Sequence, residues 1–124
     1  MYNIAVCDDS MIQQSMIKDE VMDYIQGHNM EAEVDLYGTG EQLLGAIEQG
    51  KKYDLFILDI ILLGLKGNEI AAKLRERGEK GFIMFYTATR AYENIVQECA
   101  PAEYLLKPLD KVRFDSIMDK AFEG

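Results

Sequence analysis

Tryptophan is absent from this 124-residue sequence, and cysteine, proline and histidine are scarce, with two, two and one residues respectively. The two cysteines, Cys7 and Cys99, have no metal-type spacing, which excludes a cysteine-rich zinc module. We expect both to be buried free thiols in a reducing cytoplasm. The single histidine, His28, lies in a polar turn with no catalytic partner nearby, so it is interpreted as a surface residue. No repeat, low-complexity stretch or linker is present.

Basic residues are also few. Lys and Arg total 13 against 22 Asp and Glu, which gives a net charge of −9. Such a surface repels phosphate backbones and anionic lipids, so we expect no direct contact of this domain with nucleic acid. No apolar run approaches the roughly 20 residues that span a bilayer, and Asp8 and Asp9 interrupt the first apolar stretch before it could form a signal peptide. The sequence predicts one cytoplasmic domain over residues 1–124 with no membrane partner.

Short apolar segments alternate with amphipathic ones along the chain. Strands are predicted over 3–7, 32–37, 55–58, 82–86 and 103–106. Helices are predicted over 11–26, 40–49, 68–77 and 91–98, with a last one beginning after Asp110. This alternation predicts an α/β fold with a parallel sheet, right-handed crossovers and helices on both faces, that is, a flavodoxin-like (βα)5 three-layer sandwich. The fourth helix has few apolar anchors, and we expect it to be mobile.

Polar residues follow four of the five predicted strands. Asp8 and Asp9 follow the first strand, Asp59 the third, Thr87 the fourth and Lys107 the fifth. The second strand alternates polar and apolar residues and contributes no such group, as expected of an edge strand. The predicted sheet order is therefore 2-1-3-4-5, with the crevice where ligands gather between the first and third strands.

Three carboxylates at one edge of a sheet repel one another, because each close pair costs about 4 kcal/mol at roughly 4 Å and an effective dielectric near 20. Oxygen ligands on neighbouring strands suit Mg²⁺, which takes one or two carboxylates and keeps several waters. A carboxylate, a hydroxyl and an ammonium beside such a cation can carry out phosphoryl transfer. We therefore expect Asp59 to attack a phosphodonor while Lys107 and Thr87 stabilise the phosphoryl oxygens, which gives an acyl phosphate.

The residues at the strand ends form four motifs: Asp8-Asp9, Asp59, Thr87-Ala88 and Lys107-Pro108. Together they resemble the receiver domain of two-component response regulators, and the resemblance covers essentially the whole chain. Four further segments are similar to the receivers of LytTR-type transcription regulators: 58–60, 67–71, 74–75 and 104–108.

The resemblance implies that Asp59 is the phosphoacceptor. It also implies that Asp9, Asp59 and the backbone carbonyl of Ile61 bind Mg²⁺ directly, and that Asp8 assists. Such a domain is a signalling phosphoacceptor and not an enzyme in the ordinary sense, with at most self-phosphorylation from a donor and slow self-dephosphorylation.

The resemblance further implies that Thr87 and Tyr104 form a switch pair and that a cis peptide bond before Pro108 aims Lys107 into the pocket. The expected partners are a sensor histidine kinase and a second copy of the chain, bound after phosphorylation through helix four, strand five and helix five. The expected output is transcription through a C-terminal DNA-binding domain. Three alternatives stay open: a standalone receiver, a Mg²⁺-dependent aspartate-nucleophile phosphatase, and a degenerate receiver that serves only as an interaction module.

Departures from the family pattern also carry expectations. Leu63 and Lys66 replace a common proline and a common acid, so the loop around them is expected to be looser. Ile61, Met11 and Thr89 stand at rim positions that often carry polar groups able to orient water, and an apolar rim predicts slow hydrolysis of the phosphoryl group. Four methionines are interpreted as core residues that fill gaps, namely Met11, Met16, Met22 and Met30.

Overall fold

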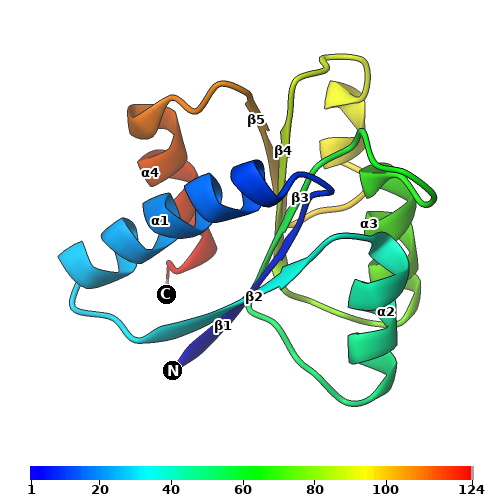
Figure 1. The fold of residues 1–124 in the computed structure, drawn as a ribbon, viewed down its shortest axis with the longest axis horizontal. Coiled ribbons are helices and arrows are strands. Elements are labelled where there is room, and N and C mark those ends of the chain that lie inside the picture. The colour runs from blue at the N-terminus through cyan, green and yellow to red at the C-terminus, as the bar shows by residue number, and fades with distance from the viewer. Residues whose placement is uncertain (124) are drawn as a thin grey trace.

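A five-stranded parallel sheet forms the centre of the structure, a computed structural model that describes residues 1–123 (Figure 1). The strands are β1 (Tyr2–Cys7), β2 (Ala32–Tyr37), β3 (Leu55–Leu58), β4 (Phe82–Thr87) and β5 (Ala102–Leu106). The helices are α1 (Met11–Gly27), α2 (Gly40–Glu48), α3 (Gly67–Glu76), α4 (Lys111–Ala121) and the short 3₁₀ helix η1 (Glu93–Val96). The strand order is β2-β1-β3-β4-β5, which confirms the predicted flavodoxin-like topology.

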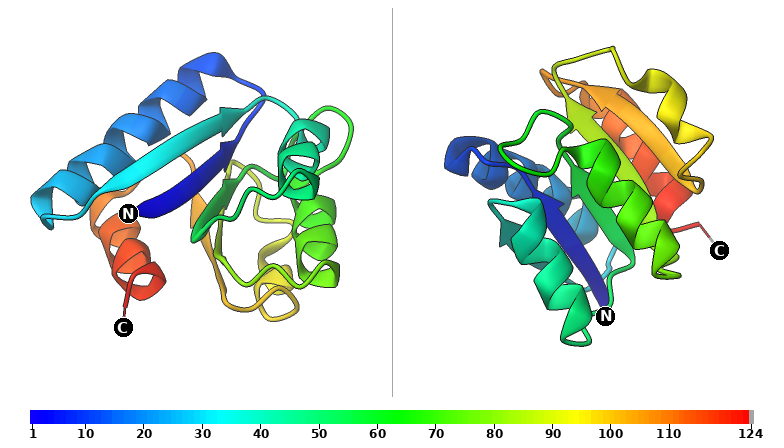
Figure 2. Two further views of the ribbon diagram at one scale, coloured as in Figure 1. Left: turned by 90° about the horizontal axis from the view of Figure 1, so that it is seen from below. Right: turned by 90° about the vertical axis from the view of Figure 1, so that its right-hand side faces the viewer.

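Two apolar layers hold the helices to the sheet. On one face, alternate strand residues such as Ile57 and Met84 pack with α1 and α4. On the other face, Phe56 and Phe85 pack with α2 and α3, and η1 lies against this layer. The two further views show α1 and α4 on one side of the sheet and α2 and α3 on the other (Figure 2). The central strand β3 is buried at all four residues, as its continuous apolar sequence predicts.

Side-chain caps fix where three of the helices begin. The hydroxyl of Ser10 accepts the backbone N–H of Gln13 at the start of α1, and Thr39 accepts that of Gln42 at the start of α2. At the start of α4, the carboxylate of Asp110 accepts two backbone N–H groups. Each contact satisfies a donor that the first helical turn leaves unpaired.

Among the described helices, none has both the length and the apolar character that crossing a bilayer requires.

The expected fourth α-helix over 91–98 is wrong. The structure has only the four-residue η1 there, and none of its residues is buried. Ile95 and Val96 pack only partly against the core, so little apolar burial is available to hold a longer helix.

The interpretation of the four methionines as core residues is wrong for two of them, since Met11 and Met16 are exposed on the first half of α1.

The strand register brings the site together. Cys7 of β1 pairs with Leu58 of β3, so the residues that follow them, Asp8 and Asp59, leave the sheet side by side. The backbone N–H of Asp59 donates to the carbonyl of Cys7 at 3.0 Å, which extends the pairing by one residue. Residues from β1 and β3 therefore meet at the carboxyl edge of the sheet.

Candidate phosphoacceptor site

Lys107 joins the ends of three strands. Its ammonium nitrogen Nζ lies 2.8 Å from Asp8 Oδ2 and 2.9 Å from Asp59 Oδ2. All three groups are largely buried, and the Lys107 side chain retains only 15% of its exposure. A residue after β5 thus bridges the two carboxylates that follow β1 and β3, although Lys107 is 99 residues from Asp8 in the chain.

The lysine supplies the positive charge that the clustered acids need. Burial alone would lower the pKa of Lys107, but hydrogen bonds and charges from Asp8 and Asp59 outweigh burial, so the pKa is raised. The ammonium is therefore fully protonated at neutral pH. The same acids also affect the Cys7 thiol. Its pKa is raised to about 12, first by burial and second by the negative charges of the acids around it.

Each buried carboxylate has a second, local hydrogen bond. Asp8 Oδ1 accepts the backbone N–H of Ser10 at 2.9 Å, and Asp59 Oδ1 accepts that of Ile61 at 3.1 Å. These bonds fix the rotation of both carboxylates, so that one oxygen of each points to Lys107. The Asp59 carboxylate is thus held in one orientation, with Oδ1 toward the Ile61 N–H and Oδ2 toward Lys107.

The donor set fits Mg²⁺, although no closed metal site is formed within residues 1–123, where no three His, Cys, Asp or Glu side chains converge. Mg²⁺ needs only one or two carboxylates, and Asp8 and Asp59 supply hard oxygens at one place. Asp9 follows directly but is exposed, and among the described residues its side chain has neither a hydrogen bond nor an ion pair. The structure therefore brings Asp8, Asp59 and Lys107 together and leaves Asp9 at the open rim.

Thr87 and Tyr104 occupy the β4–β5 side of the same edge. Thr87 is completely buried, and its hydroxyl has no hydrogen-bond partner among the described residues. Because a buried hydroxyl without a partner costs free energy, the Thr87 hydroxyl is available for a ligand oxygen. Tyr104 is also buried, and its hydroxyl donates to the carbonyl of Thr89. The backbone therefore links Thr87 to Tyr104 through Thr89.

Two features of this edge were not predicted from the sequence. Asp8, which was expected only to assist Mg²⁺ binding, also forms a direct hydrogen bond with Lys107. The Gln14 side chain donates from Nε2 to the carbonyl of Asp8 at 2.6 Å and so ties α1 to the end of β1. The expected cis bond between Lys107 and Pro108 is present, and a second cis bond precedes Pro101.

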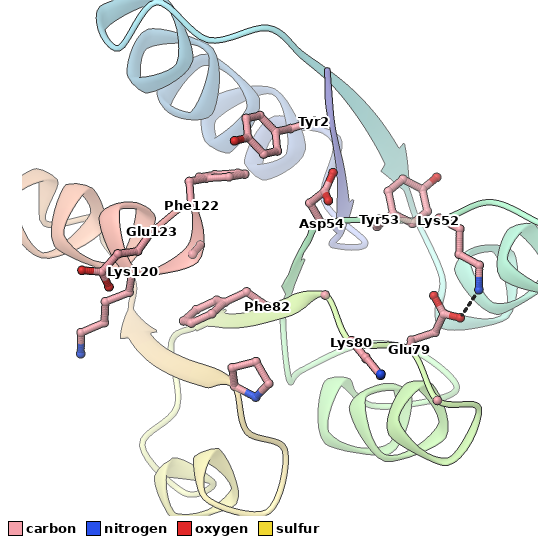
Figure 3. Close-up of a pocket in the computed structure, with 14 residues that line it drawn as sticks. Tyr2, Lys52, Tyr53, Asp54, Glu79, Lys80, Phe82, Lys120, Phe122 and Glu123 are labelled. Atoms are coloured by element: carbon pink, nitrogen blue, oxygen red, sulfur yellow. Dashed lines mark hydrogen bonds and ion pairs between the residues drawn. The ribbon is translucent and has the colours of Figure 1, made fainter.

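A separate hollow lies at the other end of the sheet, where the strands begin. It has a volume of about 660 Å³, and none of the predicted site residues lines it. Figure 3 shows Tyr2, Phe82 and Phe122 on one side of this hollow and the ion pair of Lys52 with Glu79 on the other. Its charged residues carry both signs, and no chemistry of the kind found around Asp59 is assembled there. Volume alone therefore does not identify the functional site.

The fold and the lysine-bridged aspartates define a phosphoacceptor domain of the receiver class, and the chain belongs to the response regulator receiver domain family, whose sequence model matches residues 4–119. Two curated relatives illustrate the membership. Sensory transduction protein LytT of Bacillus subtilis is 30% identical over 122 residues, which are 97% of this chain and 48% of LytT. Transcriptional regulatory protein PcoR of Escherichia coli is 39% identical over 80 residues, which are 63% of this chain and 35% of PcoR. The chain thus spans half or less of these relatives.

Solved structures agree with the fold. Response regulator protein TrrA of Thermotoga maritima, solved in complex with Mg²⁺-BeF, has a TM-score of 0.82 and 27% identity, and the match covers 98% of this chain and all of TrrA. The response regulatory domain of MrkE from Klebsiella pneumoniae has a TM-score of 0.83 at 22% identity, with 96% of this chain and 93% of that one covered. The match to LytT agrees with the resemblance to LytTR-type receivers.

Proposed function

We propose that this domain, residues 1–124, accepts a phosphoryl group on Asp59 from a sensor histidine kinase and passes the signal to an output. The observation that carries the proposal is the bridge from Lys107 to Asp8 and Asp59, because an oriented carboxylate beside a positive charge that can bind a phosphoryl oxygen suits nucleophilic attack on phosphorus. The cytoplasm is the proposed compartment, in which both buried cysteines remain free thiols.

In the proposed reaction, an oxygen of Asp59 attacks the phosphorus of the donor and forms a new P–O bond. The bond from phosphorus to the donor breaks, and the leaving group takes its electron pair. Lys107, which already contacts Asp59, would bind one phosphoryl oxygen. The unpartnered hydroxyl of Thr87 would donate to another. The chain itself acts as the acceptor and is regenerated by hydrolysis, so it is a signalling phosphoacceptor and not a turnover enzyme.

Asp9, Asp59 and the backbone carbonyl of Ile61 would hold Mg²⁺, with Asp8 in support. When bound, Mg²⁺ neutralises charge on the phosphoryl oxygens and on the clustered carboxylates. Asp9 suits this role because it is exposed and has no other partner among the described residues. TrrA, which has the same fold, was solved in complex with Mg²⁺-BeF, and this supports a Mg²⁺ site in this domain.

Slow hydrolysis is proposed for the phosphorylated state. The exposed Ile61 side chain beside Asp59 has no group that can orient an attacking water. The hydroxyl of Thr89 accepts the backbone N–H of Ala91 at 3.1 Å, which directs it to its own loop. We predict an acyl phosphate that outlasts seconds at neutral pH with Mg²⁺. Decay within seconds in a radiolabel chase would contradict this.

The rim around the site supports docking of a protein phosphodonor. Met11 and Ile12 on α1, Leu63 after β3 and Val112 on α4 are each more than 70% exposed. These apolar side chains lie on segments that begin or end at the carboxyl edge of the sheet, as Asp59 does (Figure 1). An apolar surface around a charged pocket fits the apolar face of a helix that carries a phosphohistidine.

A homodimer through η1, β5 and α4 is proposed for the phosphorylated state. Glu103 on β5 pairs with Lys120 at 3.0 Å and with Arg113 at 3.9 Å, so both signs of charge occur on one face. Such a face is self-complementary, because two copies can exchange these pairs about a two-fold axis. Movement of Tyr104 and η1 would couple the face to Thr87. Unchanged hydrodynamic size on phosphorylation would contradict the dimer.

The proposed output is transcription, through a DNA-binding domain beyond this piece. The matches to this chain cover 48% of LytT and 35% of PcoR, so both relatives contain further sequence outside the match. With a net charge of −9, the domain is not expected to contact nucleic acid itself.

Labelling with acetyl phosphate tests the proposal. Intact-mass spectrometry should detect one added phosphoryl group in the presence of Mg²⁺ and none in Asp59→Asn. The matched control is Asp54→Asn, because Asp54 lies just before β3, at the opposite end of the strand that leads to Asp59, and is exposed. Labelling of Asp59→Asn, or loss of labelling in Asp54→Asn, would contradict the assignment.

A further inference from the structure

The loop between β3 and α3, residues 60–66, carries the backbone groups that surround Asp59. Three of its hydrogen bonds are local. The N–H of Ile61 donates to Asp59 Oδ1, and the N–H of Lys66 donates to Glu69 Oε1 at 3.0 Å. The carbonyl of Ile60 accepts the N–H of Gly67 at 3.1 Å. These bonds tie the loop to its own ends and to no other part of the fold.

Glu41, in the first turn of α2, supplies a hydrogen bond from outside the loop to its backbone. Its Oε1 accepts the backbone N–H of Leu65 at 3.3 Å. Among the hydrogen bonds of residues 1–123, this one alone joins the loop to an element outside 59–70. The carboxylate also lies close over Gly64, where a Cβ would be 3.2 Å from both of its oxygens. Gly64 has a φ of +77°, so glycine allows both this backbone conformation and the close approach.

The first turn of α2, which carries Glu41, is held in place by a helix cap and by close packing. Thr39 caps the helix, and Gly40 lies so close to Ile70 and Leu65 that a Cβ would meet the Ile70 side chain at 2.6 Å. Glu41 therefore extends from a well-packed helix end to a loop whose Ile60 and Leu62 side chains are buried in the core, but whose backbone has no other hydrogen bond to an element outside 59–70 among the described residues. A single substitution of Glu41 removes this exposed hydrogen bond of 3.3 Å.

We propose that Glu41 is a positioning residue for the phosphoacceptor site: it holds the 60–66 loop so that the Ile61 carbonyl and N–H keep their places beside Asp59. The inference deepens the proposed function and rests on it. Glu41 touches neither Asp59 nor Lys107 through a hydrogen bond or ion pair, so it acts through the loop and not on the phosphoryl group.

Hydrogen exchange of the Leu65 amide in the metal-free protein tests the contact directly. Glu41→Ala should speed exchange at this amide about fivefold, the effect of losing one modest hydrogen bond. Glu41→Gln keeps an acceptor oxygen and should stay within about twofold of wild type. The matched control is Glu48→Ala in the last turn of the same helix, where Glu48 pairs with Arg77 on the surface and should leave Leu65 unchanged.

Calorimetric titration with Mg²⁺ tests the consequence. Glu41→Ala should raise the dissociation constant about fivefold, and Glu41→Gln should restore most of the affinity. Equal behaviour of Glu41→Ala and wild type would overturn the inference. Equal loss in both Glu41 variants would also overturn it, because the charge and not the hydrogen bond would then be responsible. Failure of the wild type to be phosphorylated would instead overturn the proposed function, which the exchange measurement does not use.

Discussion

Replacing Lys107 with methionine should destabilise the protein, because the ammonium is the only cation that contacts both buried carboxylates among the described residues. At 2.8 and 2.9 Å from Asp8 and Asp59, each pair has a gross attraction of about 6 kcal/mol at an effective dielectric near 20. Desolvation and repulsion between the two carboxylates offset much of this attraction. The expected net loss in unfolding free energy is about 3 kcal/mol, the usual cost of leaving buried charges unpaired.

Urea unfolding at neutral pH without divalent cations measures the loss. The matched control is Lys111→Met, since Lys111 is 56% exposed and its pairs lie at the surface, so it should change the unfolding free energy by less than about 0.5 kcal/mol. Adding Asp8→Asn to Lys107→Met should recover much of the stability, because one of the two uncompensated charges is removed.

The response to Mg²⁺ should show whether the stability lost in Lys107→Met comes from electrostatics or from packing. In Lys107→Met the carboxylates of Asp8 and Asp59 lack their cation, so Mg²⁺ should stabilise the variant more than the wild type. A loss below about 1 kcal/mol, or equal stabilisation of both proteins by Mg²⁺, would refute the reasoning that Lys107 balances the acidic edge.

Three further predictions follow from single residues. Gly67→Ala should slow acetyl-phosphate labelling at least about tenfold while the protein still folds, because a Cβ would overlap the backbone carbonyl oxygen of Asp59; Gly45→Ala, which meets open space, should label normally. Cys7 should resist iodoacetamide at about pH 8 until the protein unfolds, because it is fully buried with a pKa of about 12; rapid native alkylation would contradict this. Asp35 has a lowered pKa, chiefly because the Tyr53 hydroxyl donates to it, so its contribution to stability should be present above about pH 4 and disappear below. Urea unfolding of Asp35→Asn should therefore show a deficit at neutral pH that vanishes in acid, and a deficit independent of pH would contradict this prediction.

The sheet order was predictable because polar residues mark strand ends. Asp59 follows an apolar run and β2 carries no such residue, which together place β2 at the edge. Helix caps were equally visible, since Ser10 and Asp110 act within three residues of themselves. Local patterns of this kind need no knowledge of tertiary contacts.

Contacts between distant segments were not predictable in the same way. The sequence places Lys107 and Asp8 at one edge, but only the folded structure shows that they touch. Gly67 is required not by its own φ, which is not positive, but because α3 begins against the Asp59 carbonyl. Met11 was assigned to the core because its side chain is apolar, yet the first turn of α1 extends beyond the sheet and leaves it exposed. Such features depend on how elements pack.

Reductive trapping tests the central claim most directly. Borohydride cleaves an acyl phosphate and converts the aspartate that carried it to homoserine, which peptide mass spectrometry locates. After treatment with a phosphodonor and Mg²⁺, the mark should fall on Asp59 and should be absent without Mg²⁺. A mark on Asp8 or Asp9 instead, or no mark in a protein that is otherwise folded, would contradict the assignment of Asp59 as the phosphoacceptor.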